Sequence, residues 1–260
     1  MSAATGRMNA YAPNSGEFMK FEKVSIYIGA TDENEGLKKT VDYIMENCDI
    51  NDIDRVTMVY PKKAAAQCVE AIDMLSRKYP GKVFGMVQTR PYIGGGIRDG
   101  FDSAESSHIM LLPGDLGVSL DCIPRMISGA KEEPDTIIKT SRWLEKGCFH
   151  EYDPARKVLN RLAQIFLKVL FLSDLTDFTL PVQTMPTKLY KSIDFRELNF
   201  PFLIELVVAP LRLGARFKEI PVHCSGRSEG KSKNSFKQTA LYLKTALRVR
   251  FSPKKKLIKR

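Results

Sequence analysis

One carboxylate, Asp115, stands at the end of an apolar run in IMLLPGDLGVSLDCIP, residues 109–124. The run predicts a buried strand, and the Pro-Gly pair before Asp115 predicts a turn at its end. A carboxylate at a strand end can hold a hard cation that bridges a diphosphate. It can equally cap the segment that follows, which contains a second acid, Asp121. Asp115 is therefore a candidate metal ligand with a structural alternative.

A glycine-rich segment, GGGIRDG at residues 94–100, is a candidate phosphate-binding site. Contiguous glycines such as Gly95 let the backbone approach a phosphate, and a helix start offers N–H groups to it. A Walker A site is excluded, because no Gly-Lys-Ser/Thr follows, and the segment is not a GxGxxG motif after the first strand. A tight turn between a strand and a helix explains the same residues equally well.

A polar loop, GRSEGKSK at residues 226–233, carries basic side chains between glycine and serine. Arg227 offers a bidentate fork, and Lys231 and Lys233 offer point charges, which suit phosphate oxygens. The spacing favours an anion-binding loop over a solvated surface loop. The histidines, which do not cluster in the sequence, are interpreted as structural.

Alternating strands and helices are expected to position these residues. Leu37, Val41 and Ile44 follow helical spacing after the first strand, and the glycine-rich segment opens a later helix. Such alternation predicts an α/β fold with a mostly parallel sheet and a ligand crevice at the carboxyl ends of the strands. Strands are expected at 23–30, 55–60, 82–88, 108–112, 135–143 and, at an edge, 216–224, and helices at 64–79, 155–172, 200–214 and from 235 onward.

Composition limits the classes of protein that this chain can be. With 260 residues, 43% of them hydrophobic, it can bury a sizeable core. Its five cysteines are scattered and never in CxxC spacing, which favours a reducing compartment without a zinc site or disulfide framework. No stretch reaches the length of about 18 apolar residues that a membrane span needs. We therefore expect a cytoplasmic protein.

The formal net charge of +10 indicates an anionic partner, which can be a nucleotide, a nucleic acid or an acidic membrane surface. In the tail after Ser235, Leu243 and Leu247 alternate with Lys244 and Arg248, joined by Phe236, Lys237 and Arg250. This pattern suits an interfacial helix on anionic lipid, and hence peripheral attachment to the inner face of a membrane. A helix packed on its own domain with a solvated basic side explains the pattern at least as well.

The order of these segments resembles that of the family 2 inverting glycosyltransferases, in the branch similar to dolichyl- or polyprenyl-phosphate sugar synthases. The resemblance covers about residues 22–250. VSIYIGATDENEGLKKTV resembles the opening strand and acidic turn of the family, with Glu33 at the family's acid and Asp32 where asparagine is usual. GGGIRDGF places Arg98 at a matching position, LLPGD resembles the metal-binding strand end, and TSRW is similar to the Gly-Ser-Arg motif. The most specific match is FLIELVVAPLRLGARFKEIPVHCSGRSEGKSK, with its Glu205 helix and basic loop.

Two stretches differ from the family pattern. After the second strand the family usually carries two aspartates and Gly-Ser, whereas this chain has YPKK, with Lys62 and Lys63. The family's metal site usually has an Asp-x-Asp pair, whereas this chain keeps only Asp115. Fewer anionic oxygens hold a cation less tightly, and we expect the two lysines to replace the metal in part.

The resemblance implies a GT-A-like, Rossmann-like domain at 22–234, after a flexible lead-in at 1–21 and before a basic tail at 235–260. It implies Mg²⁺ or Mn²⁺ on Asp115, and phosphate contacts from Arg227 and Lys233. It also implies that Arg142 orients the acceptor phosphate or the sugar. The nucleotide side would comprise Ala30, Thr31, Glu33, Gly95, Arg98 and Gly114.

The expected activity is transfer of a sugar, with inversion, from a nucleotide-sugar donor to a polyprenyl phosphate or another acceptor of a glycan pathway, such as one for cell-envelope polysaccharide. The altered YPKK and PGD stretches leave a non-enzymatic binding or scaffold role as the alternative. Nucleic-acid binding rests on charge alone, without an RNA-binding aromatic motif or a recognition-helix module, and is not expected.

Overall fold

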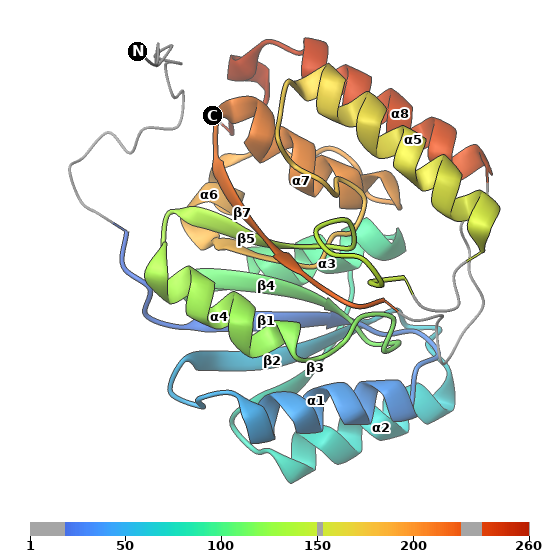
Figure 1. Cartoon of the computed structure of the whole chain (residues 1–260). Coiled ribbons are helices and arrows are strands. Elements are labelled where there is room, and N and C mark those ends of the chain that lie inside the picture. The colour runs from blue at the N-terminus through green and yellow to red at the C-terminus, as the bar shows by residue number, and fades with distance from the viewer. Residues whose placement is uncertain (1–18, 150–152, 225–235, 260) are drawn as a thin grey trace.

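The strands of this computed structural model, which describes residues 19–149, 153–224 and 236–259, form one mixed sheet. Its order is β3-β2-β1-β4-β6-β5-β7 (Figure 1). The α/β prediction is confirmed, including the position of the last strand at an edge. The strands are β1 (Val24–Gly29), β2 (Ile53–Tyr60), β3 (Val83–Val87), β4 (His108–Pro113), β5 (Thr136–Ser141), β6 (Gln183–Pro186) and β7 (Arg216–Pro221).

The strand register brings the ends of distant segments to one edge of the sheet. Gly29 at the end of β1 lies opposite Val59 of β2 and Pro113 of β4, and these pairings are parallel. β6 runs antiparallel to both β4 and β5, so β5 and its parallel partner β7 run in the same direction as β4. The carboxyl ends of β1, β2, β4, β5 and β7 therefore share this edge, which we call the carboxyl edge.

Helices cover both faces of the sheet (Figure 1). One core joins the sheet to α1, α2 and α4, and a second joins its other face to α3, α6 and α7. Helices α5 and α8 form an outer layer beyond α7. The helices are α1 (Glu35–Asn47), α2 (Ala66–Lys78), α3 (Tyr92–Asp102), α4 (Cys122–Glu132), α5 (Pro154–Phe171), α6 (Thr187–Ser192), α7 (Pro201–Leu213), α8 (Phe236–Phe251) and a 3₁₀ turn at Lys254–Lys256.

The sequence does not predict β6 and α6, which lie in the Pro- and Thr-rich passage around residue 183. β6 has only four residues, QTMP, too few to show a hydrophobic period. All four are buried, because β4 and β5 flank the strand and supply its hydrogen-bonding partners. Tertiary pairing, rather than local preference, makes this segment a strand.

Helix α8 packs on its own domain, in agreement with the second interpretation of the basic tail. Thr245, Ala246 and Val249 are buried. Arg248 Nη2 donates to Glu205 Oε1 of α7 at 2.6 Å, and the Glu205 carboxylate also accepts the N–H groups of Arg196 and Glu197. Since Glu205 is only 1% exposed, this ion pair fastens α8 to α7.

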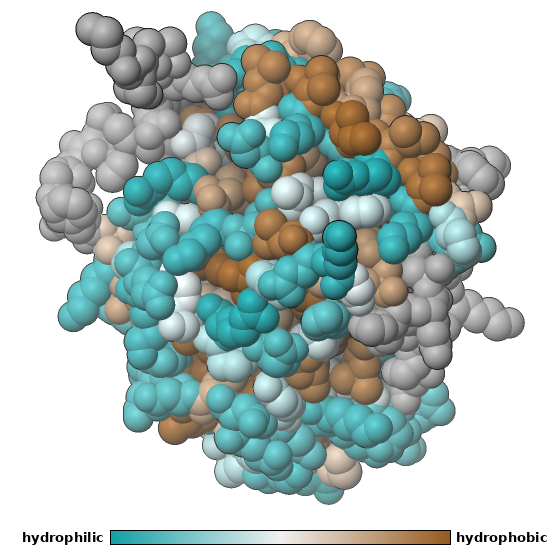
Figure 2. All heavy atoms as spheres, in the orientation of Figure 1, coloured by the Kyte–Doolittle hydropathy of each residue, from teal (hydrophilic) through white to brown (hydrophobic). Residues whose placement is uncertain are grey.

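Large apolar side chains remain on the surface of the outer layer. Figure 2 shows them as a band over α5, on the side away from the sheet. Across the part of the chain that the structure describes, no helix has the combined length and apolar character needed to cross a membrane.

We predict that Glu205→Gln lowers the free energy of unfolding by about 2 kcal/mol, because the buried Arg248 contact loses its charge-assisted partner. Urea denaturation measures the change. Lys244→Gln, at an exposed position of α8, is the control and should change little. A Glu205→Gln variant as stable as the wild type would contradict the role given to this pair.

Candidate functional site

The first turn at the carboxyl edge follows β1 and carries Ala30, Thr31 and Glu33. The Glu33 carboxylate folds back on the turn, and its Oε2 accepts the N–H groups of Thr31 at 2.6 Å and Asp32 at 3.1 Å. The Ala30 N–H donates to the carbonyl of Val59. The structure thus brings these three predicted residues together, with Glu33 organising the backbone of the turn.

Asp115 lies two residues beyond β4, beside this turn. Its Oδ1 accepts the N–H of Gly117 at 3.0 Å, which closes a tight loop, and Leu116 between them has a positive φ of 54°. The start of α1 packs closely on the loop, since a Cβ on Gly36 would stand 2.7 Å from the Gly114 carbonyl oxygen. Asp115 is therefore fixed at the strand end and is 9% exposed.

The YPKK stretch ends β2 at the same edge. Lys62 and Lys63 are exposed, in a turn closed by the Ala64 N–H and the Pro61 carbonyl. The N–H of the following residue, Ala65, donates to the Thr31 carbonyl, so this turn contacts the turn that follows β1. The basic residues therefore flank the place where the resemblance predicts the nucleoside.

The glycine-rich segment forms the interior of α3 rather than a loop. The Gly95 N–H donates to the Leu198 carbonyl at 2.9 Å, and a Cβ on Gly95 would approach Arg90 to 2.8 Å. Arg98 Nη1 points to the Glu197 carbonyl at 3.5 Å. These glycines permit close packing of α3, and the Gly95 amide that was expected to meet a phosphate is already engaged by the protein.

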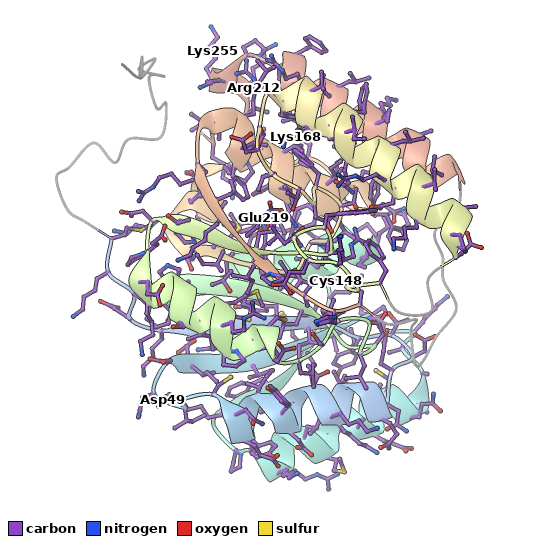
Figure 3. The ribbon with its side chains drawn as sticks, in the orientation of Figure 1. Asp49, Cys148, Lys168, Arg212, Glu219 and Lys255 are labelled. Atoms are coloured by element: carbon purple, nitrogen blue, oxygen red, sulfur yellow. The ribbon has the colours of Figure 1, made fainter. Side chains whose placement is uncertain are left out.

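Three further side chains with metal-binding atoms gather at the carboxyl edge. The ligand atoms of Glu145, Cys148 and His223 lie within 4.8 Å of one another, with Cys148 buried. Figure 3 labels Cys148 near the ends of the strands. The Ser119 N–H donates to the His223 carbonyl at 2.8 Å, so the end of β7 touches the segment that follows Asp115. The sequence, which favours a structural role for His223, does not indicate this group, because its members are far apart in the chain.

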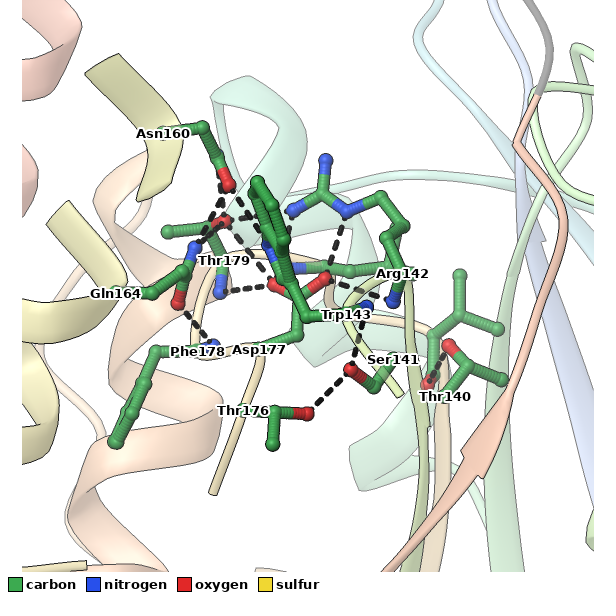
Figure 4. A network of polar contacts seen from close by, with 12 residues as sticks. Thr140, Ser141, Arg142, Trp143, Asn160, Gln164, Thr176, Asp177, Phe178 and Thr179 are labelled. Carbon is green, nitrogen blue, oxygen red and sulfur yellow. Dashed lines mark hydrogen bonds and ion pairs between the residues drawn. The ribbon is translucent and has the colours of Figure 1, made fainter. Parts of the chain in front are cut away.

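Arg142 follows β5 and is locked into a buried ion pair (Figure 4). Its Nε donates to Asp177 Oδ2 at 2.7 Å, and its Nη2 donates to Asp177 Oδ1 at 2.9 Å and to Thr179 at 2.8 Å. Asp177 is completely buried, and burial alone would raise its pKa. The charge and hydrogen bonds of Arg142, together with the Lys139 charge, outweigh this effect and hold the pKa of Asp177 well below the usual range.

Two more charged groups complete the network around this pair. Lys139 of β5 is fully buried, and its Nζ donates to the Leu180 carbonyl. Burial lowers the pKa of Lys139 to about 8, although Asp177 and Glu219 oppose the shift. Glu219 of β7 accepts the N–H groups of Thr176 and Asp177, while burial raises its pKa. The sequence signal for this network is Lys139 directly after Ile137 and Ile138 in a predicted strand.

Arg227 and Lys233, together with the rest of the basic loop, lie outside the described residues. Their predicted contacts with phosphate stay predictions.

Comparison with solved structures shows proteins of similar fold. Glucosyl-3-phosphoglycerate synthase from Mycobacterium tuberculosis, in complex with Mn²⁺, UDP-glucose and phosphoglyceric acid, superposes with a TM-score of 0.66 and 14% identity, over 89% of this chain and 81% of that one. The fold is GT-A-like. The same enzyme with Mn²⁺, UDP and glucosyl-3-phosphoglycerate gives a TM-score of 0.64 at 13% identity, over 88% and 80% of the two chains. No family model matches the sequence.

The comparison confirms a GT-A glycosyltransferase-like fold and leaves the specific family open. A further complex of the mycobacterial enzyme contains Mg²⁺ and UDP, at a TM-score of 0.63 and 12% identity. By their descriptions, these neighbours bind a nucleotide together with a divalent cation. The carboxyl edge of this GT-A-like fold, with Asp115 and the turn after β1, is the candidate active site.

We predict that Asp177→Asn lowers the free energy of unfolding by about 3–5 kcal/mol, because Arg142 and Lys139 lose their counter-charge in a buried site. The ionised Asp177 stabilises the protein above its ordinary pKa of about 4. The difference between wild type and variant should therefore shrink as the pH falls below that value. Asp174→Asn, an exposed acid in the same loop, is the matched control. Equal denaturation midpoints for Asp177→Asn and wild type would refute the prediction.

We predict a pH effect at Lys139, whose pKa is about 8 in the folded protein and 10.5 ordinarily. Between these values the unfolded chain holds a proton that the folded protein has released, so this group adds stability as the pH rises. The free energy of unfolding of wild type relative to Lys139→Met should therefore increase across the window. Denaturant titrations at several pH values measure it, with the exposed Lys255→Met as control. A constant difference would rule out the shifted pKa.

Proposed function

We propose that this protein is a glycosyltransferase that uses a nucleotide-sugar donor. The observation that carries the proposal is the convergence of the turn after β1 with Asp115 at the carboxyl edge of a GT-A-like sheet. Ala30, Thr31 and Glu33 would line the nucleoside pocket. Gly114 and Asp115 would lie on the side of the diphosphate.

The donor set at this edge fits a divalent cation. Asp115 supplies one carboxylate. Glu145, Cys148 and His223 form a separate group, with ligand atoms within 4.8 Å of one another, that the sequence alone did not indicate. The imidazole and thiol of that group suit an ion such as Zn²⁺, whereas the Asp115 carboxylate suits Mg²⁺ or Mn²⁺, which prefer oxygen ligands. A bound cation would offset the charge that develops on the leaving diphosphate.

The chain's own basic residues would share the task of holding the leaving group. Lys62 and Lys63 stand exposed at the end of β2, and Arg227 and Lys233 are proposed to contact phosphate from the basic loop. An acceptor oxygen would attack the anomeric carbon from the opposite side as the bond to the diphosphate breaks, which inverts the configuration. A phosphate acceptor is already anionic and needs no general base, and we therefore favour polyprenyl phosphate as the acceptor.

Arg142 has a more restricted role in this proposal than the resemblance implied. Its Nε and Nη2 are held by Asp177 and Thr179, so its guanidinium cannot turn freely towards a ligand. Arg142 would instead fix the backbone of residues 174–180 beside the acceptor side and contribute its charge there.

Calorimetric titration tests the donor site. Wild-type protein should bind a UDP-sugar or a GDP-sugar more tightly with Mn²⁺ than without it. Asp115→Asn should weaken the metal-dependent part by about tenfold or more, since a cation loses its ionised ligand. Asp121→Asn, an exposed acid on the same segment, is the matched control. Failure of the wild type to bind any nucleotide sugar would refute the enzyme and favour the binding or scaffold role.

The acceptor is tested separately, by product formation with polyprenyl phosphate or 3-phosphoglycerate in the presence of the donor that binds. Transfer to the lipid phosphate supports the proposed acceptor. Transfer only to 3-phosphoglycerate would keep the glycosyltransferase and refute the lipid acceptor.

A further inference from the structure

The outer face of α5 is apolar and exposed, the reverse of an ordinary surface helix. Val158 is 61% exposed, Val169 is 69% exposed and Leu172, just past the helix, is 63% exposed. Figure 2 shows this band at the upper right of the molecule. With helical spacing, the face comprises Val158, Leu162, Ile165, Phe166, Val169 and Leu172.

The opposite face of α5 explains why the apolar residues point outward. Gln164 is buried, its Nε2 donating to Thr179 at 2.8 Å and its Oε1 accepting the Phe178 N–H at 2.7 Å. Asn160 accepts the indole N–H of Trp143. A rotation that buried the apolar face would break these hydrogen bonds inside the protein, so the orientation of α5 is specified.

The charged side chains within α5 and α8 themselves are all basic. Neither α5 nor α8 contains an aspartate or glutamate. Lys168 is exposed on α5, with the exposed Asp174 beyond the helix at 3.9 Å from its Nζ. Lys255 and Lys256 are exposed beyond Phe251, which ends α8 and is 73% exposed. Figure 3 labels Lys168 and Lys255 in this outer layer. Arg250 Nε donates to the Leu170 carbonyl at 2.6 Å, which holds the ends of α5 and α8 together.

We propose that the outer face of α5, with Phe251 at its end, docks on the surface of a bilayer containing anionic lipid. The helix would lie in the plane of the interface, with its apolar side chains among the acyl chains and the lysines against headgroup phosphates. A second copy of this chain fits less well, because a face-to-face dimer would oppose two layers whose helices carry only basic charges. The docking is independent of the proposed glycosyltransferase activity.

Vesicle co-sedimentation of the full chain tests the docking, with phosphatidylcholine alone and with phosphatidylcholine mixed with phosphatidylglycerol. Wild type should bind the mixed vesicles more tightly, and added salt should weaken the binding. Ile165→Gln with Val169→Gln should lower the partition coefficient about tenfold or more, through lost apolar burial. Met74→Gln with Val87→Gln removes exposed apolar residues from α2 and β3 and should bind as the wild type does.

Thermal melting should show that both double variants keep the fold, since all four side chains are exposed. The proposal would be overturned if the wild-type protein did not bind anionic vesicles, or if the α5 variant bound them as tightly as the wild type. Sedimentation velocity adds a third check. If the wild type is a dimer and the α5 variant a monomer, the face serves self-association and the lipid proposal is overturned.

Discussion

The buried Arg142–Asp177 pair is the constraint on which the candidate site and the outer helices both depend. It ties the end of β5 to the loop at residues 174–180, which also rests on Glu219 of β7. The same loop offers Thr179 and Phe178 to Gln164 of α5. One network of charged and polar groups therefore sets the position of the loop beside the site and the rotation of α5 about its own axis.

Removing such a network from water costs free energy, and this cost is offset because each charged group has a partner of opposite charge or a hydrogen bond. Two cationic side chains, Lys139 and Arg142, face two acidic ones, Asp177 and Glu219, in surroundings where an unpaired charge would be strongly destabilising. Burial lowers the pKa of Lys139 and raises the pKa of Glu219, because it disfavours the charged form of each group. Hydrogen bonds to backbone N–H and carbonyl groups supply the remaining partners. The arrangement favours one geometry of the loop over alternatives.

The surfaces on either side of this network differ in chemistry. At the carboxyl edge, a carboxylate, an imidazole and a thiol gather beyond the ends of β5 and β7, and the turn after β1 lies beside the loop of Asp115. On the outer layer, apolar side chains with lysines suit a headgroup boundary. If both proposals hold, the protein would meet a lipid-linked acceptor at the membrane surface while binding its donor from the aqueous phase.

Local sequence patterns determined most of the framework and part of the site. Apolar periodicity gave the alternating elements, because side-chain burial repeats with the period of the element. The end of a predicted strand gave Asp115, and the family resemblance gave Glu33. Tertiary structure alone decided that β6 is a strand, that the glycines lie within α3, and that α8 packs inward through Arg248. It also placed Cys148 close to His223, and the charge of Lys139 close to that of Asp177. These contacts link residues distant in the chain, and their burial depends on neighbours that no local pattern specifies.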